Sequence, residues 1–168
     1  MTSQAALKEM LTSCTLRLDT SRGPQGTAFF VAPGYAITAA HLVDGAKGTR
    51  VYLKGRAATW NGHIQDVRPG RPGDSVAPSG LYPAPDIALI HVADGPAHPC
   101  VLLGTQENTV GSDVMVLGHS RTIDGVTVMA ESECFKVTGE LETPDPGCTL
   151  LKLGHHRDRK STRLNSSH

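Results

Sequence analysis

The sequence has few aromatic residues and no long hydrophobic run. Phenylalanine, tryptophan and tyrosine make up 4% of the 168 residues, so a core must be built mainly from aliphatic side chains. No apolar run is long enough to cross a bilayer, and residues 1–20 lack the apolar stretch of a signal peptide. We therefore expect a cytoplasmic protein that does not bind membranes.

The sequence also lacks an excess of charge of one sign. It contains 16 basic and 16 acidic residues, which gives a formal net charge of zero with histidine neutral. Proteins that bind nucleic acid usually carry a basic surface that attracts the phosphates. The composition therefore predicts no nucleic-acid partner.

The cysteines do not show the spacing of a metal site. The four cysteines, Cys14, Cys100, Cys134 and Cys148, include no C-x-x-C pair, and His155-His156 has no clustered partner ligands. We expect no metal and no cofactor. Reduced thiols agree with an intracellular protein, although the even number of cysteines leaves a disulfide open.

Glycine and proline are plentiful and divide the chain into short segments. The 18 glycines and 11 prolines favour an all-β protein with frequent turns, preceded by a helical segment over residues 1–12. The predicted strands are Cys14–Leu18, Thr27–Ala32, Tyr35–Thr38, Arg50–Leu53, Ala58–Val67, Ile87–Val92, Asp113–Leu117, Val126–Ala130, Phe135–Leu141 and Cys148–Leu153.

One motif stands out against this background. Residues 26–41 read Gly-Thr-Ala-Phe-Phe-Val-Ala-Pro-Gly-Tyr-Ala-Ile-Thr-Ala-Ala-His, two apolar strands joined by a Pro-Gly turn and ending at His41. Residues 86–90 read Asp-Ile-Ala-Leu-Ile and begin a later strand with Asp86. Both segments resemble the histidine and aspartate motifs of trypsin-like serine proteases, in particular the bacterial trypsin-like peptidase domain.

The resemblance implies a fold and a chemistry. The family fold is two antiparallel β-barrels, which implies an N-terminal barrel over residues 13–97, a linker around 94–99 and a C-terminal barrel over 98–157. Family members hydrolyse peptide bonds in protein or peptide substrates without a cofactor. The resemblance makes His41 the general base and Asp86 the carboxylate that orients it.

The third residue of the triad is missing from this sequence. No Gly-x-Ser-Gly motif occurs, and Ser120 and Cys148 both lack the glycine that would follow a nucleophile. We interpret Ser120 as a turn residue and Cys148 as a buried thiol. Asp44 is too close to His41 in sequence to orient its ring from behind, and we interpret it as a cap of the turn with Gly45.

The end of the sequence suggests why the nucleophile is missing. Residues 158–168 read Asp-Arg-Lys-Ser-Thr-Arg-Leu-Asn-Ser-Ser-His, which resembles a translated sequencing adapter. We therefore expect an artefactual, disordered tail on a fragment truncated before its serine, with an incomplete second barrel and no activity of its own. Further domains can follow in the full-length protein. The alternative is a non-catalytic protease homologue that acts as a binding module.

Overall fold

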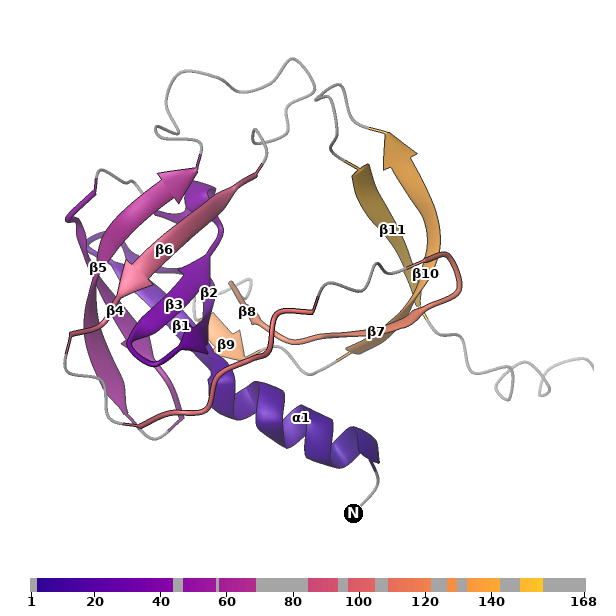
Figure 1. Ribbon diagram of the computed structural model, residues 1–168, viewed down its shortest axis with the longest axis horizontal. Coiled ribbons are helices and arrows are strands. Elements are labelled where there is room, and N and C mark those ends of the chain that lie inside the picture. The colour runs from indigo at the N-terminus through magenta and orange to yellow at the C-terminus, as the bar shows by residue number, and fades with distance from the viewer. Residues whose placement is uncertain are drawn as a thin grey trace, which may run out of the picture.

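The computed structural model describes residues 3–43, 47–56, 58–68, 85–93, 97–104, 109–121, 127–129, 133–142 and 149–155. A helix, α1 (Ser3–Cys14), leads into the β-structure, and a 3-10 helix spans Ala40–Leu42 (Figure 1). The strands are β1 (Thr15–Thr20), β2 (Gly23–Ala32), β3 (Tyr35–Thr38), β4 (Arg50–Lys54), β5 (Thr59–Arg68), β6 (Ile87–His91), β7 (Asp113–Val116), β8 (His119–Arg121), β9 (Thr127–Met129), β10 (Glu133–Glu142) and β11 (Thr149–His155).

The first six strands form a closed antiparallel barrel. Their order around the barrel is β1-β2-β3-β6-β5-β4, so β1 pairs with both β2 and β4 and no edge is left open. Strand β4 shows why this sequence forms a barrel wall. Val51 and Leu53 are buried, whereas the alternate residues Arg50, Tyr52 and Lys54 are exposed.

Aliphatic residues fill the barrel, as the scarcity of aromatic residues predicts. The buried cluster contains one aromatic ring, Phe30, which packs edge-on against Trp60 with ring centroids 5.4 Å apart. The cluster consists of Leu16, Leu18, Ala28, Phe30, Ala36, Ala40, Val43, Val51, Leu53, Ile64, Val67, Ala88, Ile90 and Val92. Small residues such as Ala28, Ala36 and Ala88 let the opposite walls of the barrel approach one another.

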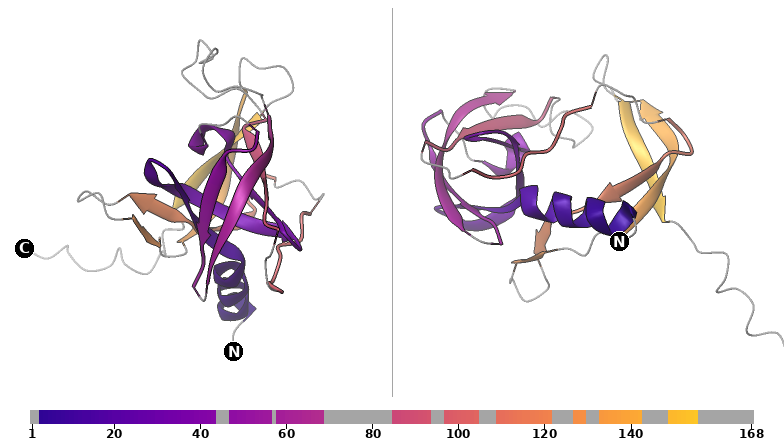
Figure 2. Two further views of the ribbon diagram at one scale, coloured as in Figure 1. Left: turned by 90° about the vertical axis from the view of Figure 1, so that its left-hand side faces the viewer. Right: turned by 60° about the horizontal axis from the view of Figure 1, so that its bottom comes forward.

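The remaining strands form a second, partial β-structure. Strands β11, β10 and β7 make a three-stranded sheet, and β8 and β9 make a two-stranded one (Figures 1 and 2). The all-β prediction, with one complete barrel and an incomplete second one, is confirmed. Among the described residues, no helix has the length and apolar character needed to span a membrane.

Two sequence-based expectations are wrong. Ser120 does not lie in a turn but in strand β8, where it pairs with Val128 of β9. Cys14 belongs to α1 and not to the first strand, because hydroxyl groups support the end of the helix. Thr12 and Thr15 donate hydrogen bonds to the carbonyls of Lys8 and Leu11, at 2.8 and 2.7 Å.

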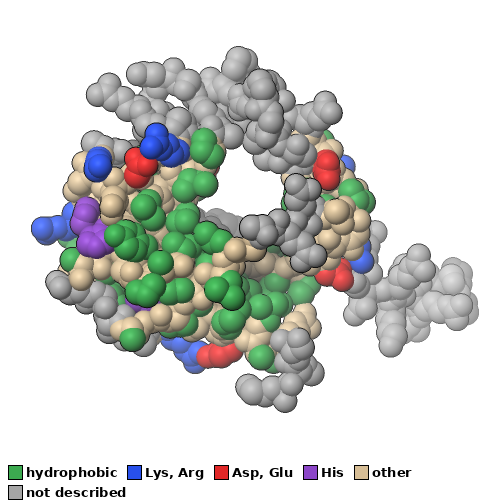
Figure 3. All heavy atoms as spheres, in the orientation of Figure 1, with side chains coloured by type: hydrophobic (Ala, Val, Ile, Leu, Met, Phe, Trp, Pro, Cys, Tyr) green, Lys and Arg blue, Asp and Glu red, His purple; other side chains and the backbone are tan. Residues whose placement is uncertain are grey.

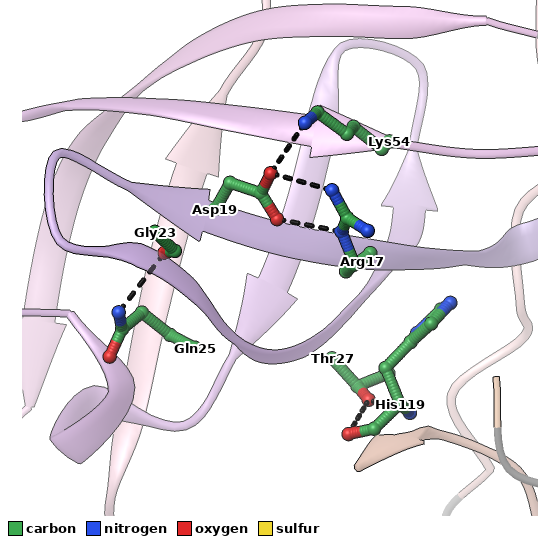
Figure 4. A network of polar contacts seen from close by, with 7 residues as sticks. All are labelled: Arg17, Asp19, Gly23, Gln25, Thr27, Lys54 and His119. Atoms are coloured by element: carbon green, nitrogen blue, oxygen red, sulfur yellow. Dashed lines mark hydrogen bonds and ion pairs between the residues drawn. The ribbon is translucent and has the colours of Figure 1, made fainter. Parts of the chain in front are cut away.

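A charged network lies outside the barrel core (Figure 4). Asp19 is almost fully buried, and its carboxylate accepts hydrogen bonds from Arg17 at 2.8 and 2.9 Å and pairs with Lys54 at 2.7 Å. Burial raises the pKa of Asp19, but the hydrogen bonds from Arg17 and Lys54 outweigh it and hold that pKa below its usual value. The charged form of Asp19 therefore stabilises the fold.

This network makes the stability of the fold dependent on pH. Because the pKa of Asp19 is lower in the folded state, its contribution is complete above the unfolded value of about 3.9 and is lost as the pH falls through the folded value. We expect Asp19→Asn to cost about 1–3 kcal/mol at pH 7 and much less in strong acid. Urea unfolding at both pH values measures this. An equal cost at both values would contradict the assignment.

Candidate active site

The register of the barrel strands brings His41 and Asp86 to the same end of the barrel. Strand β3 pairs with β6, with Thr38 opposite Ala88. His41 follows Thr38 in the 3-10 helix, and Asp86 directly precedes Ile87, the first residue of β6. Antiparallel pairing therefore places the exit of β3 beside the entry of β6, although β4 and β5 lie between them in the sequence.

The two residues make two hydrogen bonds to each other. Asp86 Oδ2 lies 2.7 Å from His41 Nδ1, and Asp86 Oδ1 accepts a hydrogen bond from the backbone N–H of His41 at 3.0 Å. Asp86 also has a positive φ of 21°, which is unusual for a residue with a side chain. Both carboxylate oxygens hold His41; the contact with Nδ1 is the one expected from the sequence, and the bond from the backbone N–H is additional.

This geometry selects one tautomer of His41. An ionised carboxylate can only accept hydrogen bonds, so the proton of a neutral ring lies on Nδ1 and faces Asp86. Nε2 then carries the lone pair. The side chain of His41 is 49% exposed and that of Asp86 is 31% exposed, so the ring is accessible from solvent. The pair can take up a proton at Nε2 and stabilise the resulting imidazolium.

The residues before His41 hold the pair in place through close packing. Ala40 is fully buried, and the Thr38 hydroxyl donates a hydrogen bond to the carbonyl of Thr27 at 2.7 Å. A Cβ atom at Gly26 would lie 2.7 Å from Leu42 Cδ1, so the Leu42 side chain would have to move to make room for it. The buried Ala40 and the contact of Leu42 with Gly26 show that the His41 segment packs onto β2 and the barrel core.

Among the described residues, the other candidates from the sequence do not gather at this pair. Within the described residues, no group of three or more His, Cys, Asp or Glu side chains is arranged to hold a metal ion. Cys14, Cys100 and Cys134 are free thiols. Asp44, Cys148, His156 and the adapter-like segment 158–168 lie outside the described residues.

One histidine with a shifted pKa was missed by the sequence analysis. The backbone N–H of His119 donates to the Thr27 hydroxyl at 2.6 Å. The Thr27 hydroxyl in turn lies 3.5 Å from the His119 carbonyl oxygen, and these contacts join β8 to the barrel strand β2 (Figure 4). Burial, and then the nearby charge of Arg17, lower the pKa of His119, while Asp19 opposes this shift. No local signal identifies His119, because its partners come from β1 and β2.

Comparison with known proteins agrees with this geometry. The family model described as "Trypsin-like peptidase domain" matches residues 26–150, which is well over half of the chain. The match includes both His41 and Asp86. No curated protein matches the chain in sequence.

Solved structures with the same fold include the Rv3671c protease of M. tuberculosis. Its inactive form superposes with a TM-score of 0.57 at 15% identity and covers 88% of this chain. Its active form gives a TM-score of 0.51 at 17% identity and covers 90%. This chain spans 64% and 63% of the length of those two structures, respectively. At sequence identities this low, the structural similarity shows a common fold only.

Proposed function

This chain belongs to the trypsin-like peptidase family, and on that premise we propose that it carries the histidine and aspartate of a serine endopeptidase. The observation that supports the proposal most strongly is the 2.7 Å contact between His41 Nδ1 and Asp86 Oδ2. The proposed reaction is hydrolysis of internal peptide bonds in a protein or peptide substrate through an acyl-enzyme.

His41 and Asp86 would act in both halves of this reaction. His41 Nε2 removes the proton of a serine hydroxyl as that oxygen attacks the substrate carbonyl, and it then delivers the proton to the leaving amine. Asp86 keeps the ring in the Nδ1–H tautomer and stabilises the imidazolium that forms. The second hydrogen bond, from the His41 backbone to Asp86 Oδ1 at 3.0 Å, fixes the carboxylate relative to the ring.

The nucleophile is the part of the proposal that this sequence does not contain. No Gly-x-Ser-Gly motif occurs in the 168 residues. We place the serine and the oxyanion-hole amides on a segment of the full-length protein outside this sequence. Sequencing the gene beyond the codon of residue 157 tests this directly. A full-length gene without a serine in that motif would overturn the proposal of a serine endopeptidase.

The chain of 168 residues should have no serine protease activity by itself. His41 has no positioned hydroxyl to activate, and each missing oxyanion donor costs about 2.7–4 kcal/mol of transition-state stabilisation. We expect a fluorophosphonate probe to label no serine of this chain, while trypsin in a parallel reaction is labelled. Labelling of Ser120, followed by peptide mapping, would contradict this prediction.

A second candidate function is a non-catalytic binding module. The absence of Gly-x-Ser-Gly from the sequence is the observation that favours it. In that case His41 and Asp86 would remain as a structural pair, and the full-length protein would bind peptides without cleaving them. Incubation of the full-length protein with a casein substrate separates the two functions, because only the endopeptidase releases fragments.

A further inference from the structure

A second pair of reactive groups lies away from His41 and Asp86, where the end of α1 meets the segment 97–104. In the barrel, Thr15, the residue after Cys14, pairs with Phe29, the residue before Phe30. The backbone N–H of Val101 donates to the carbonyl of the same Phe30 at 2.9 Å. Thr15, which follows Cys14, and Val101, which follows Cys100, therefore contact adjacent residues of β2, Phe29 and Phe30.

Two further observations place these segments together. Ser13 of α1 and His98 and Pro99 of the 97–104 segment line one cavity of about 220 Å³. Figures 1 and 2 show the segment 97–104 passing the end of α1 where the helix enters the barrel. Burial, as the largest cause, raises the pKa of the Cys14 thiol. A hydrogen bond with Ser13 lowers that pKa, and the charge of Cys100 raises it.

The surroundings of Cys100 equip it to react first. The ring of His98 stacks on Phe30 with centroids 3.3 Å apart, and its Nε2 accepts a hydrogen bond from the backbone N–H of Gly34 at 3.3 Å. Nε2 therefore carries the lone pair, and the proton of the neutral ring is on Nδ1. Nδ1 lies 3.3 Å from the carbonyl oxygen of Pro99 and 3.6 Å from Cys100 Sγ, so its N–H lies beside the sulfur and is shared with that carbonyl. A thiolate at Cys100 would keep this donor.

The two thiols differ in accessibility. Cys14 is fully buried, whereas Cys100 is half-buried and packs against the edge of the core. A bulky oxidant can therefore reach Cys100 but not Cys14. Cys134, which is also half-buried, lies in β10 and accepts a hydrogen bond from Gln4 at 3.0 Å, so its surroundings differ from those of Cys100.

We propose that Cys14 and Cys100 form a redox-active dithiol, in which Cys100 meets the oxidant and Cys14 completes the disulfide. With glutathione disulfide as the oxidant, the Cys100 thiolate attacks one glutathione sulfur and releases the other glutathione as a thiolate. Cys14 then loses its proton and attacks Cys100 Sγ, which releases the second glutathione. In total, the two protein thiols are oxidised to one disulfide, and glutathione disulfide is reduced to two glutathione thiols. The two protons lost by the cysteines are taken up by the two glutathione thiolates.

The disulfide would join the start of the barrel to the segment that leads to the second sheet.

The test is to add glutathione disulfide to the folded chain, to count the free thiols after denaturation, and to map the disulfide-linked peptides by digestion without reduction. We expect the wild-type chain to yield peptides joined through Cys14 and Cys100. The matched control Cys134→Ser should give the same joined peptides, because Cys134 takes no part.

Two variants separate the roles of the proposed pair. In the Cys14→Ala variant, whose alanine suits the buried position, oxidation should stop after one glutathione has been attached to Cys100. Cys100→Ala should leave Cys14 unmodified. His98→Phe keeps a ring that stacks on Phe30 but removes the N–H beside the sulfur, and it should slow the modification of Cys100 by about tenfold. Circular dichroism melting checks that each variant is folded.

Three results would overturn the proposal. The first is a wild-type chain that keeps glutathione on Cys100 without forming the joined peptides. The second is a disulfide that excludes Cys14 or Cys100. The third is modification of Cys14 in a folded Cys100→Ala variant at the rate at which wild-type Cys100 reacts. None of these readouts depends on protease activity, so failure of the proposed function would leave this test unaffected.

Discussion

In the proposed endopeptidase, replacing His41 by alanine in the full-length protein should lower kcat by about 10⁶-fold, because a triad acts as a unit and its base would then be missing. Asp86→Asn should lower kcat by about 10⁴-fold, because an amide beside Nδ1 favours the wrong tautomer of the ring. The two changes together should cost little more than His41→Ala alone. Single-turnover hydrolysis of a chromogenic peptide ester measures all three variants.

Matched controls come from the outer wall of the barrel. His63 is an exposed histidine in β5, and Asp66, in the same strand, pairs with the exposed side chain of Arg68 at 3.1 Å. His63→Ala and Asp66→Asn change the same residue types without touching the His41–Asp86 pair, and they should leave kcat within about twofold. If Asp86→Asn retained wild-type activity, the proposed role of Asp86 in the reaction would be wrong.

Replacing Phe30 by alanine should destabilise the barrel by about 3–5 kcal/mol. Phe30 is fully buried, and it is the ring on which both Trp60 and His98 pack, with centroids 5.4 and 3.3 Å away. Its removal opens a cavity and also takes away the surface that holds the 97–104 segment. Since small domains have about 5–15 kcal/mol of total stability, the variant should unfold at a much lower urea concentration.

Two further variants show whether the effect comes from the Phe30 ring. Phe30→Leu keeps much of the buried volume and should cost clearly less than Phe30→Ala. Leu102 lies in the same segment as His98 but is 97% exposed, so Leu102→Ala should change the free energy of unfolding by less than about 0.5 kcal/mol. A cost for Phe30→Ala no larger than that for Leu102→Ala would contradict the central position of Phe30 in the core.

Much of the first barrel could be predicted from local sequence. The strand predicted at Arg50–Leu53 corresponds to β4, and the apolar runs on either side of Pro33-Gly34 correspond to β2 and β3. Gly34 has a φ of +74°, and a Cβ atom there would lie 3.1 Å from the carbonyl oxygen of Val92, so glycine suits this turn. Strand patterning and turn preferences depend on residues that are close in sequence, so both can be predicted from one sequence.

The candidate site residues also came from the sequence, because His41 and Asp86 each lie in a recognisable motif. Their distance and their hydrogen bonds were decided by the pairing of β3 with β6, which joins segments far apart in the chain. The interpretation of Ser120 as a turn residue was wrong for a related reason. Its partner Val128 comes from another segment, and no local pattern in so short a strand predicts that pairing.

The sequence by itself determined the all-β class, the strands of the first barrel and the residue types of the candidate site. Only the tertiary structure decided that Asp19 is buried between Arg17 and Lys54, that His98 stacks on Phe30, and that Thr15 and Val101 contact adjacent residues of β2. The physical reason is that patterning and turn preferences act between near neighbours, whereas burial, charge pairing and contacts between distant segments depend on which strands close the barrel.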